Sequence, residues 1–296
     1  MPQWDDLRVF LAVARTESLS RAAAPLKMDA ATVGRRIARL EADVGAALFV
    51  KSPQGYALTD VGVRLRDHAI DAEAALLRAI EETQGGAQTG LSGQIRIGAP
   101  DGAANYLLPQ VCAAIGADNP DLEIQILALP RVVNLSKREA DMAITVSPPQ
   151  AGRLSVQKIT DYHLHLATTR DIAGRITALA DLRSERLVGY IPDMIFDKEL
   201  DYLGELGVRG VPVASNSVAV QAMALRAGAG VGIVHDFALP FAPELVRILR
   251  GDVSLTRSFY LARHTSDRMS DRLTRFAGLL TTRLRAEVVR LEGLVA

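Results

Sequence analysis

The chain is poor in the features that mark secreted, membrane-bound or strongly charged proteins. Cys112 is the only cysteine among 296 residues, so no disulfide can form within the chain, and we expect a reducing compartment. No run of about twenty apolar residues is present, and the first residues lack the apolar core of a signal peptide. Lysines and arginines equal aspartates and glutamates in number, so any contact with a polyanion must be local. We therefore predict a cytoplasmic protein without a membrane span.

What the chain has in quantity is hydrophobic side chains, at 49% of its residues. That share and the length predict two or three domains with buried cores. The single Cys112 falls in an apolar helical pattern, which favours an inert buried thiol.

The stretch from Ser18 to Glu41 reads as two short helices joined by a tight turn. Ser18 and Asp29 are each suited to cap a helix, because their side-chain oxygens accept from free backbone N–H groups. The second helix carries Val33, Ile37 and Leu40 on one side and arginines around the rest. This pattern is typical of a helix-turn-helix whose second helix enters the DNA major groove. A solvated helix pair in another fold is the alternative.

Two further observations support a DNA contact. Seven cations and four carboxylates lie between Arg15 and Lys51, which leaves a local excess of about three positive charges. A strand, a Pro/Gly turn and a second strand follow near residues 48–59, which predicts a hairpin wing. The predicted DNA-contacting residues are Ser20, Arg21, Ala30, Ala31, Thr32, Arg35, Arg36, Arg39, Lys51, Ser52 and Gln54.

Here the chain resembles the LysR-type transcriptional regulators. The matching positions are Phe10, Ser18–Ser20, Arg21–Ala23, Leu26, Val33, Arg35, Ile37, Leu40–Glu41, Leu48–Phe49, Leu58–Thr59 and Gly62. The chain departs from the family pattern at Asp29-Ala30, where Ser-Gln is common, and at Gly34, where Ser is common. The missing glutamine removes one possible base reader, so the target sequence of a relative does not carry over.

A long helix is predicted from about residue 60 to 83. Leu65, Ala69, Ala72 and Leu76 recur in steps of three and four, a pattern of helix pairing, so we predict that these four residues form a dimer interface. Packing against the helix's own domain is the alternative. A Gly-rich, uncharged stretch at residues 84–93 predicts a hinge. The resemblance implies the same dimerising helix and hinge.

From residue 94 onward, strands alternate with helix-length segments, which predicts a largely parallel α/β sheet. The resemblance implies an effector domain of two lobes, similar to a periplasmic binding protein. The predicted boundaries are 1–59 for the winged helix-turn-helix, 60–93 for the linker helix and hinge, and 94–296 for the effector domain. Its first lobe takes about 94–160 and 264–296, and its second lobe takes about 161–263.

A ligand in such a domain is expected at the carboxyl ends of the strands, between the lobes. Pro100 has no N–H to offer and Asp101 would repel a carboxylate, so a neutral effector, or one held through Arg131, stays open. The predicted effector-binding residues are Pro100, Asp101, Gly102, Arg131, Thr145, Val146, Ser147, Ile191, Met194, Phe196, Asn216 and Ser217. Each could equally be ordinary loop structure.

We find no pattern that predicts catalysis, a cofactor or a metal site. The glycines of residues 228–232 follow a helix and enter a strand, the reverse of the order in a dinucleotide fingerprint. His163, His165, His235 and His264 have no cysteine or carboxylate cluster at ligand spacing. The predicted function is a ligand-responsive DNA-binding regulator that forms a dimer or tetramer on an inverted repeat and contacts RNA polymerase. A two-lobed small-molecule-binding protein or enzyme with an incidental helical N-terminal domain is the alternative.

Overall fold

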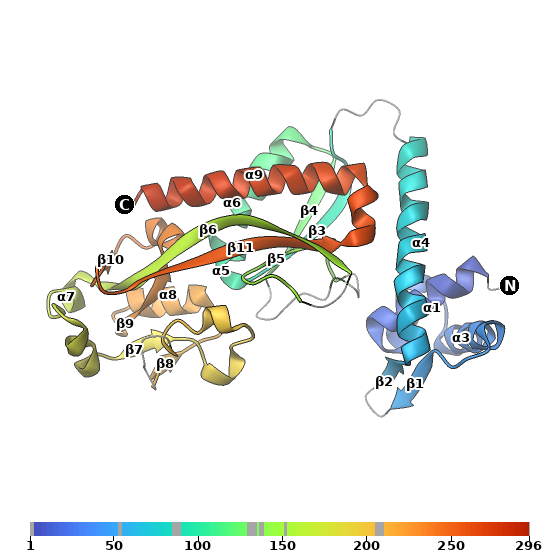
Figure 1. The fold of residues 1–296 in the computed structure, drawn as a ribbon, viewed down its shortest axis with the longest axis horizontal. Coiled ribbons are helices and arrows are strands. Elements are labelled where there is room, and N and C mark those ends of the chain that lie inside the picture. Colours follow the sequence, from blue (N-terminus) through green and yellow to red (C-terminus); the bar gives the residue numbers. More distant parts are fainter. Residues whose placement is uncertain are drawn as a thin grey trace. The chain divides into compact units, whose positions relative to one another are not determined.

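The computed structural model describes residues 3–52, 55–84, 90–128, 135, 139–150, 153–204 and 210–295. They form two compact units, one within Met1–Gln88 and the other almost wholly after it. Figure 1 shows both as ribbons. In the described part of the chain, no helix is long and apolar enough to cross a membrane.

The first unit contains four helices and a two-stranded sheet among its described residues. They are α1 (Trp4–Thr16), α2 (Leu19–Leu26), α3 (Ala30–Val44), β1 (Phe49–Ser52), β2 (Gly55–Leu58) and α4 (Asp60–Gln84). The strands pair antiparallel, with Phe49 opposite Leu58. The sequence predicted α2, α3, both strands and α4, because the signals for them are local.

Short signals in the chain set the ends of these helices. Ser18 accepts a hydrogen bond from the N–H of Arg21, and Asp29 accepts one from Thr32, so both predicted caps are present. At the other ends, Lys27 and Gly45 adopt left-handed backbone conformations, with φ of 54° and 75°. The turn between α2 and α3 is therefore short.

The helix α4 packs on the rest of its own unit through its first half. Ala69 is 3% exposed and Ile70 is 1% exposed, and both lie in the same core as Phe10. Leu65 packs against this core, and Glu73 forms an ion pair with Arg15 of α1. Two of the four predicted interface residues, Leu65 and Ala69, thus have partners within their own unit. Heptad spacing could not reveal this, because it shows only that a helix has an apolar stripe.

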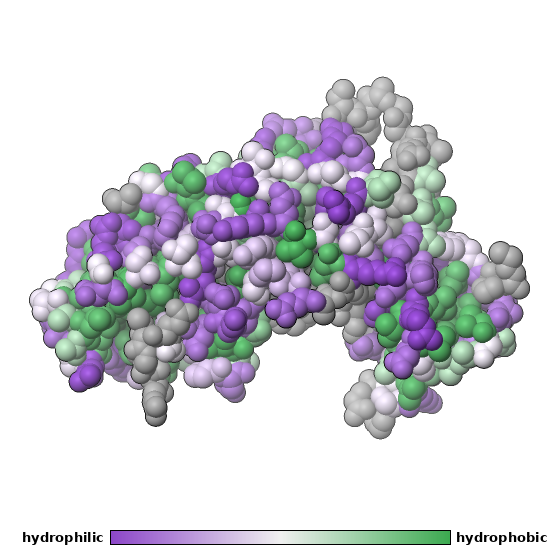
Figure 2. Space-filling view, in the orientation of Figure 1, coloured by the Kyte–Doolittle hydropathy of each residue, from purple (hydrophilic) through white to green (hydrophobic). Residues whose placement is uncertain are grey.

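The second half of α4 differs, because those of its apolar side chains that the structure describes face solvent. Ala72 is exposed and Leu76 keeps 45% of its surface. Figure 2 colours this stretch toward the hydrophobic end of its scale.

The second unit is an α/β domain built on one nine-stranded sheet. Its strands are β3 (Gly93–Ala99), β4 (Leu122–Ala128), β5 (Met142–Thr145), β6 (Leu154–Thr169), β7 (Leu187–Gly189), β8 (Val213–Ala214), β9 (Val231–His235), β10 (Leu245–Arg247) and β11 (Ser254–His264). Its α-helices are α5 (Asp101–Tyr106), α6 (Leu108–Asp118), α7 (Arg170–Ala173), α8 (Val218–Arg226) and α9 (Asp271–Gly293). Short 3₁₀ turns lie between them, including η3 (Pro192–Met194), η4 (Lys198–Leu200) and η6 (Asp236–Phe241).

The sheet has two halves that share a central pair of long strands. The strand order is β4-β3-β5-β11-β6-β9-β7-β8, and β10 pairs with β6. β3 runs parallel to β4 and β5, and β7 runs parallel to β8 and β9. β6 and β11 run antiparallel to each other between these groups, so the chain enters the second group along β6 and returns along β11. We call β3–β5 with α5 and α6 the first half, and β7–β9 with α8 the second half.

Burial follows this arrangement. One core runs through both halves and includes Tyr162 of β6 and Phe259 of β11, whose rings stack at 4.1 Å. The helix α9 contributes Phe276, Leu280 and Leu284 to the same core. Figure 1 shows α9 running along the central strands.

Two sequence expectations differ from the observed elements. The apolar spacing predicts a single helix from Asn105 to Ala117, but α5 begins at Asp101 and the helix is interrupted at Leu107 before α6. Pro109 lies in the first turn of α6, where its missing N–H is harmless, and it cannot continue α5. The alternating apolar residues also predict a strand near 164–168, but β6 begins ten residues earlier, because its more polar first part crosses between the halves.

Candidate DNA-binding surface and ligand crevice

The first two turns of α3 present the predicted DNA-contacting face. Ala31 and Arg35 are exposed, whereas Val33, Ile37 and Leu40 are buried beneath them. Asp29 accepts from the backbone N–H of Thr32 at 2.8 Å and from its hydroxyl at 2.7 Å. These hydrogen bonds lower the pKa of Asp29, because they stabilise its ionised form. The guanidinium of Arg35 donates to the same Thr32 hydroxyl at 2.7 Å, which orients it over the start of the helix.

Arg36 and Arg39 have a partner that sequence reasoning did not identify. Asp6 of α1 is fully buried, and its carboxylate accepts from Nε of Arg39 at 2.7 Å. Arg36 lies 3.5 Å from the same carboxylate. The hydrogen bond to Asp6 raises the pKa of Arg39. These arginines fasten α3 to α1, and their predicted DNA contact stays a prediction.

The other predicted DNA-contacting residues lie near both ends of this surface. Ser20 and Arg21 are exposed on α2, and Ala30 is half-buried at the start of α3. On the wing, Lys51 is exposed and the Ser52 hydroxyl donates to the carbonyl of Gly55 at 3.3 Å. Gln54 lies outside the described residues.

A carboxylate joins the two halves of the second unit at their junction between α5 and α8, which we call the crevice because the effector is predicted to bind there. Asp101, at the start of α5, accepts from the Ser217 hydroxyl at 3.0 Å and from the N–H of Ala219 at 3.2 Å. The other carboxylate oxygen accepts from Asn105 at 2.7 Å. Ser217 also caps α8 by accepting from the N–H of Val220. The negative charge of Asp101 thus lies at the positive end of α8.

A second hydrogen bond also joins the two halves. The Ser147 hydroxyl, just after β5, donates to the carboxylate of Asp197 in the second half. Thr145 donates to the carbonyl of Ser147 at 2.7 Å and thereby shapes this loop. Among the residues that the structure describes, neither Asp101 nor Asp197 has a cationic partner.

The remaining predicted effector residues differ in exposure. Gly102 and Val146 are buried, Pro100, Ile191, Phe196 and Asn216 are half-buried, and Met194 is 50% exposed. Arg131 lies outside the described residues. The structure brings the candidates Asp101 and Ser217 together, and it pairs Ser147 with Asp197, which was not among the predicted residues.

Beneath the crevice lies a buried cluster of rings centred on His235, which the sequence did not indicate as a site. Its ring is next to Gly102, where a side chain would contact it, and 4.8 Å from the ring of Phe237. The hydroxyl of Tyr202 lies 3.4 Å from Nε2 of His235. Burial lowers the pKa of His235 to about 3, so this ring is neutral at ordinary pH.

The other described histidines and the cysteine that we considered for catalysis or metal binding are either paired with a carboxylate or buried. His165 and Arg247 both contact the carboxylate of Asp236, and His163 contacts Glu292. Burial raises the pKa of the Cys112 thiol to about 11, which disfavours the reactive thiolate. No group of three or more metal-binding side chains is found in the described part of the chain.

Known proteins match both units. The profile of the LysR substrate binding domain matches residues 88–285, and that of the bacterial regulatory helix-turn-helix protein, lysR family, matches residues 4–63. The transcriptional regulator PtxR of Pseudomonas aeruginosa is 27% identical over 256 residues, 83% of this chain and 81% of its own. The regulator DgdR of Burkholderia cepacia is 34% identical over 152 residues, half of each chain.

Solved structures of similar fold cover nearly the whole chain. A full-length OxyR variant from Pseudomonas aeruginosa has a TM-score of 0.72 at 19% identity and covers 96% of this chain and 98% of its own. LysG of Corynebacterium glutamicum with bound effector arginine has a TM-score of 0.64 at 16% identity, with coverage of 97% and 98%. At these identities the likeness shows the fold. The two profile matches confirm the resemblance seen in the sequence and exclude the alternative of an enzyme: the chain belongs to the LysR-type transcriptional regulators.

Proposed function

We propose that this protein is a cytoplasmic dimer, or a dimer of dimers, that binds an inverted repeat in promoter DNA and responds to a small molecule. The observation that carries the proposal is the two-sided structure of α3. Its inner side is buried, and its outer side presents Ala31, Thr32 and Arg35 beside the positive end of the helix. An exposed first turn with an oriented guanidinium suits the major groove. Contact with RNA polymerase is part of the same proposal.

Within this proposal, one cation contacts the DNA bases and others contact the phosphates. Arg35 is held by Thr32 over the start of α3 and is placed to read a base edge. Arg21 and Lys51 are exposed on either side, on α2 and the wing, and are suited to phosphates together with Ser20, Ser52 and Gln54. Few phosphate contacts per subunit favour binding as a dimer.

The dimer interface is proposed on the second half of α4. Ala72 and Leu76 are spaced by four residues and exposed, and Ala75 and Ala79 extend the same apolar surface. Helix pairing would bury this surface in a second copy. Leu65 and Ala69, which pack within their own unit, would hold α4 in position.

The effector is proposed to bind between the two halves of the sheet, near Asp101, Ser147, Asn216 and Ser217. A ligand there has to replace the hydrogen bonds of Ser217 and Ser147 with its own, and this changes how the halves are held. Because Asp101 already fills the positive end of α8, a carboxylate on the ligand would be repelled. The residues around these bridges, Pro100, Gly102, Thr145, Val146, Ile191, Met194 and Phe196, would form the walls, and Arg131 stays a candidate.

The test begins with sequencing the DNA fragments that the purified protein retains. With an operator in hand, Arg35→Ala should weaken binding about tenfold or more in a titration at fixed salt, because a base contact is lost. The matched control is Arg8→Ala, which removes an exposed arginine of α1. This variant should bind nearly as the wild type does. Equal affinity of both variants would remove Arg35 from the interface.

A further inference from the structure

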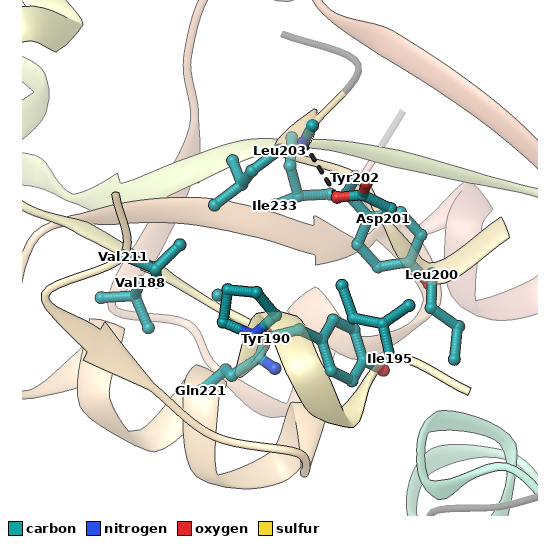
Figure 3. A pocket seen from close by; sticks show the side chains of 13 residues that line it. Val188, Tyr190, Ile195, Leu200, Asp201, Tyr202, Leu203, Val211, Gln221 and Ile233 are labelled. Atoms are coloured by element: carbon teal, nitrogen blue, oxygen red, sulfur yellow. Dashed lines mark hydrogen bonds between the residues drawn. The ribbon is translucent and has the colours of Figure 1, made fainter. Parts of the chain in front are cut away.

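A cavity lies inside the second half of the sheet domain, apart from the bridges of the crevice. Its volume is about 220 Å³. Val188 and Tyr190 of the β7 segment form one side, and Ile233 of β9 and Gln221 of α8 form others. The segment from Ile195 to Gly204 covers it. Figure 3 shows these side chains around the space, with the N–H of Gly204 bonded to Asp201.

The walls of this cavity are mainly apolar, and one buried amide is left half-satisfied. Gln221 is 5% exposed, and its Nε2 donates to the carbonyl of Ser215 at 2.8 Å. No described residue donates to its Oε1, and this oxygen is not among the fully buried atoms that lack a partner, so it is open to the cavity. The residue lines the cavity, so a ligand inside can supply that donor.

Tyr190 and Tyr202 form the aromatic side of the cavity, with ring centroids 5.9 Å apart. Burial, and next the charge of Asp101, raise the pKa of Tyr190, so its phenol stays protonated and neutral. No cation is among the described lining residues, and Asp201 adds a negative charge to them. An anionic molecule is therefore disfavoured.

Size narrows the class of ligand. An apolar cavity of roughly 150 Å³ accommodates one benzene molecule, so this one has room for a single ring with a small substituent. We propose that the cavity is a binding site for a small, uncharged ring compound that carries one hydrogen-bond donor, such as a phenol, with the donor bonded to Oε1 of Gln221. This goes beyond the proposed function, because the site lies in one half of the domain and does not need the crevice to open.

The site also contacts the crevice through packed rings. Tyr202 lines the cavity, and its hydroxyl lies 3.4 Å from His235, whose ring is next to Gly102 at the start of α5. A ligand that moves Tyr202 thus acts on residues that border Asp101.

The experiment measures binding to the full-length protein without DNA, by fluorine NMR. The probes are 4-fluorophenol, fluorobenzene and 4-fluorobenzoate. We expect saturable binding of 4-fluorophenol and at least about tenfold weaker binding of the benzoate, because its charge meets the carboxylate of Asp201. Wild-type protein that shows no saturable binding of 4-fluorophenol, or prefers the benzoate, overturns the proposal.

Three variants locate the site. Gln221→Leu should weaken 4-fluorophenol about tenfold and leave fluorobenzene unchanged, because only the hydrogen bond is lost. Val211→Phe, at the half-buried edge of the cavity, should abolish binding of both by filling the space. Gln110→Leu is the matched control: its Nε2 also donates to a backbone carbonyl and its Oε1 also lacks a partner, but it lies on α6. The proposed site is contradicted if Gln110→Leu weakens 4-fluorophenol as much as Gln221→Leu does, or if Val211→Phe binds 4-fluorophenol as the wild type does.

Discussion

A carboxylate joins α1 to α3 in the first unit, and another joins the two halves of the sheet domain, but the partners of these two carboxylates differ in kind. Asp6 is fully buried and paired with two arginines. Asp101 is half-buried, and its donors among the described residues are a hydroxyl, a side-chain amide and a backbone N–H, none of them charged. Water or a ligand can replace neutral donors at little cost, whereas a buried charge cannot lose its cation cheaply. The first carboxylate suits a fixed platform, and the second suits a joint that a ligand can change.

The largest effect is expected at Asp6. Asp6→Ala should lower the free energy of unfolding of the first unit by about 3 kcal/mol, because charge-assisted hydrogen bonds are lost from a fully buried site. Denaturant titration of the purified variant measures this. Asp5→Ala, which removes an exposed carboxylate 3.6 Å from Arg36, should cost less than about 0.5 kcal/mol. If both variants are equally stable, the ion pairs of Asp6 do not hold α3 against α1.

The next largest effect is expected from acid, which should destabilise the sheet domain through His235. The pKa of His235 is about 3 in the folded protein and near 6.5 when unfolded, so between these values only the unfolded chain binds the proton. The free energy of unfolding therefore falls as the pH drops below 6.5, by about 1.4 kcal/mol per pH unit and roughly 2 kcal/mol by pH 5.

Replacing the ring tests this dependence. His235→Phe should lose this part of the pH dependence, measured by denaturant titrations between pH 7 and 5. His68→Gln, which alters an exposed histidine on α4, is the control and should keep the wild-type slope. An unchanged slope in His235→Phe would mean that other groups cause the acid sensitivity.

A smaller effect is expected at Asp101. Asp101→Ala should destabilise the second unit by about 1 kcal/mol, because the hydrogen bonds that it loses are to neutral donors. A double-mutant cycle with Ser217→Ala should give a coupling energy of about 0.5 kcal/mol or more. Asp121→Ala, at an exposed position, provides the control. Strict additivity would show that the two side chains do not act together.

The sequence predicted what is local and missed what joins distant segments. Both caps of the helix-turn-helix were predicted because Ser18 and Asp29 act on N–H groups three residues away. The bond between Arg39 and Asp6 spans 33 residues, and that between Asp101 and Ser217 spans 116, so no spacing rule reaches them. The sequence did not indicate Gln221 as a binding residue, because a single glutamine in a helix forms no recognisable motif until the cavity beside it is known.

The same limit explains the stripe of α4. Leu65 and Leu76 lie on one predicted seam, but the first packs against its own unit and the second is exposed. Periodicity shows that a helix has a face to bury and does not say which chain covers it.

The smallest effect is expected at Ser147, the donor in the other bridge of the crevice. Asp197 is half-buried and also accepts from the N–H of Glu199 at 3.0 Å, so it keeps a partner when the hydroxyl is removed. Ser147→Ala should therefore cost about 0.5 kcal/mol in denaturant titration. A loss larger than that of Asp101→Ala would reverse the assignment, because the bridge to Asp197 would then hold the halves together. In that case the ligand that opens the crevice would have to compete for Ser147, and Asp101 would serve only to keep anions away from α8.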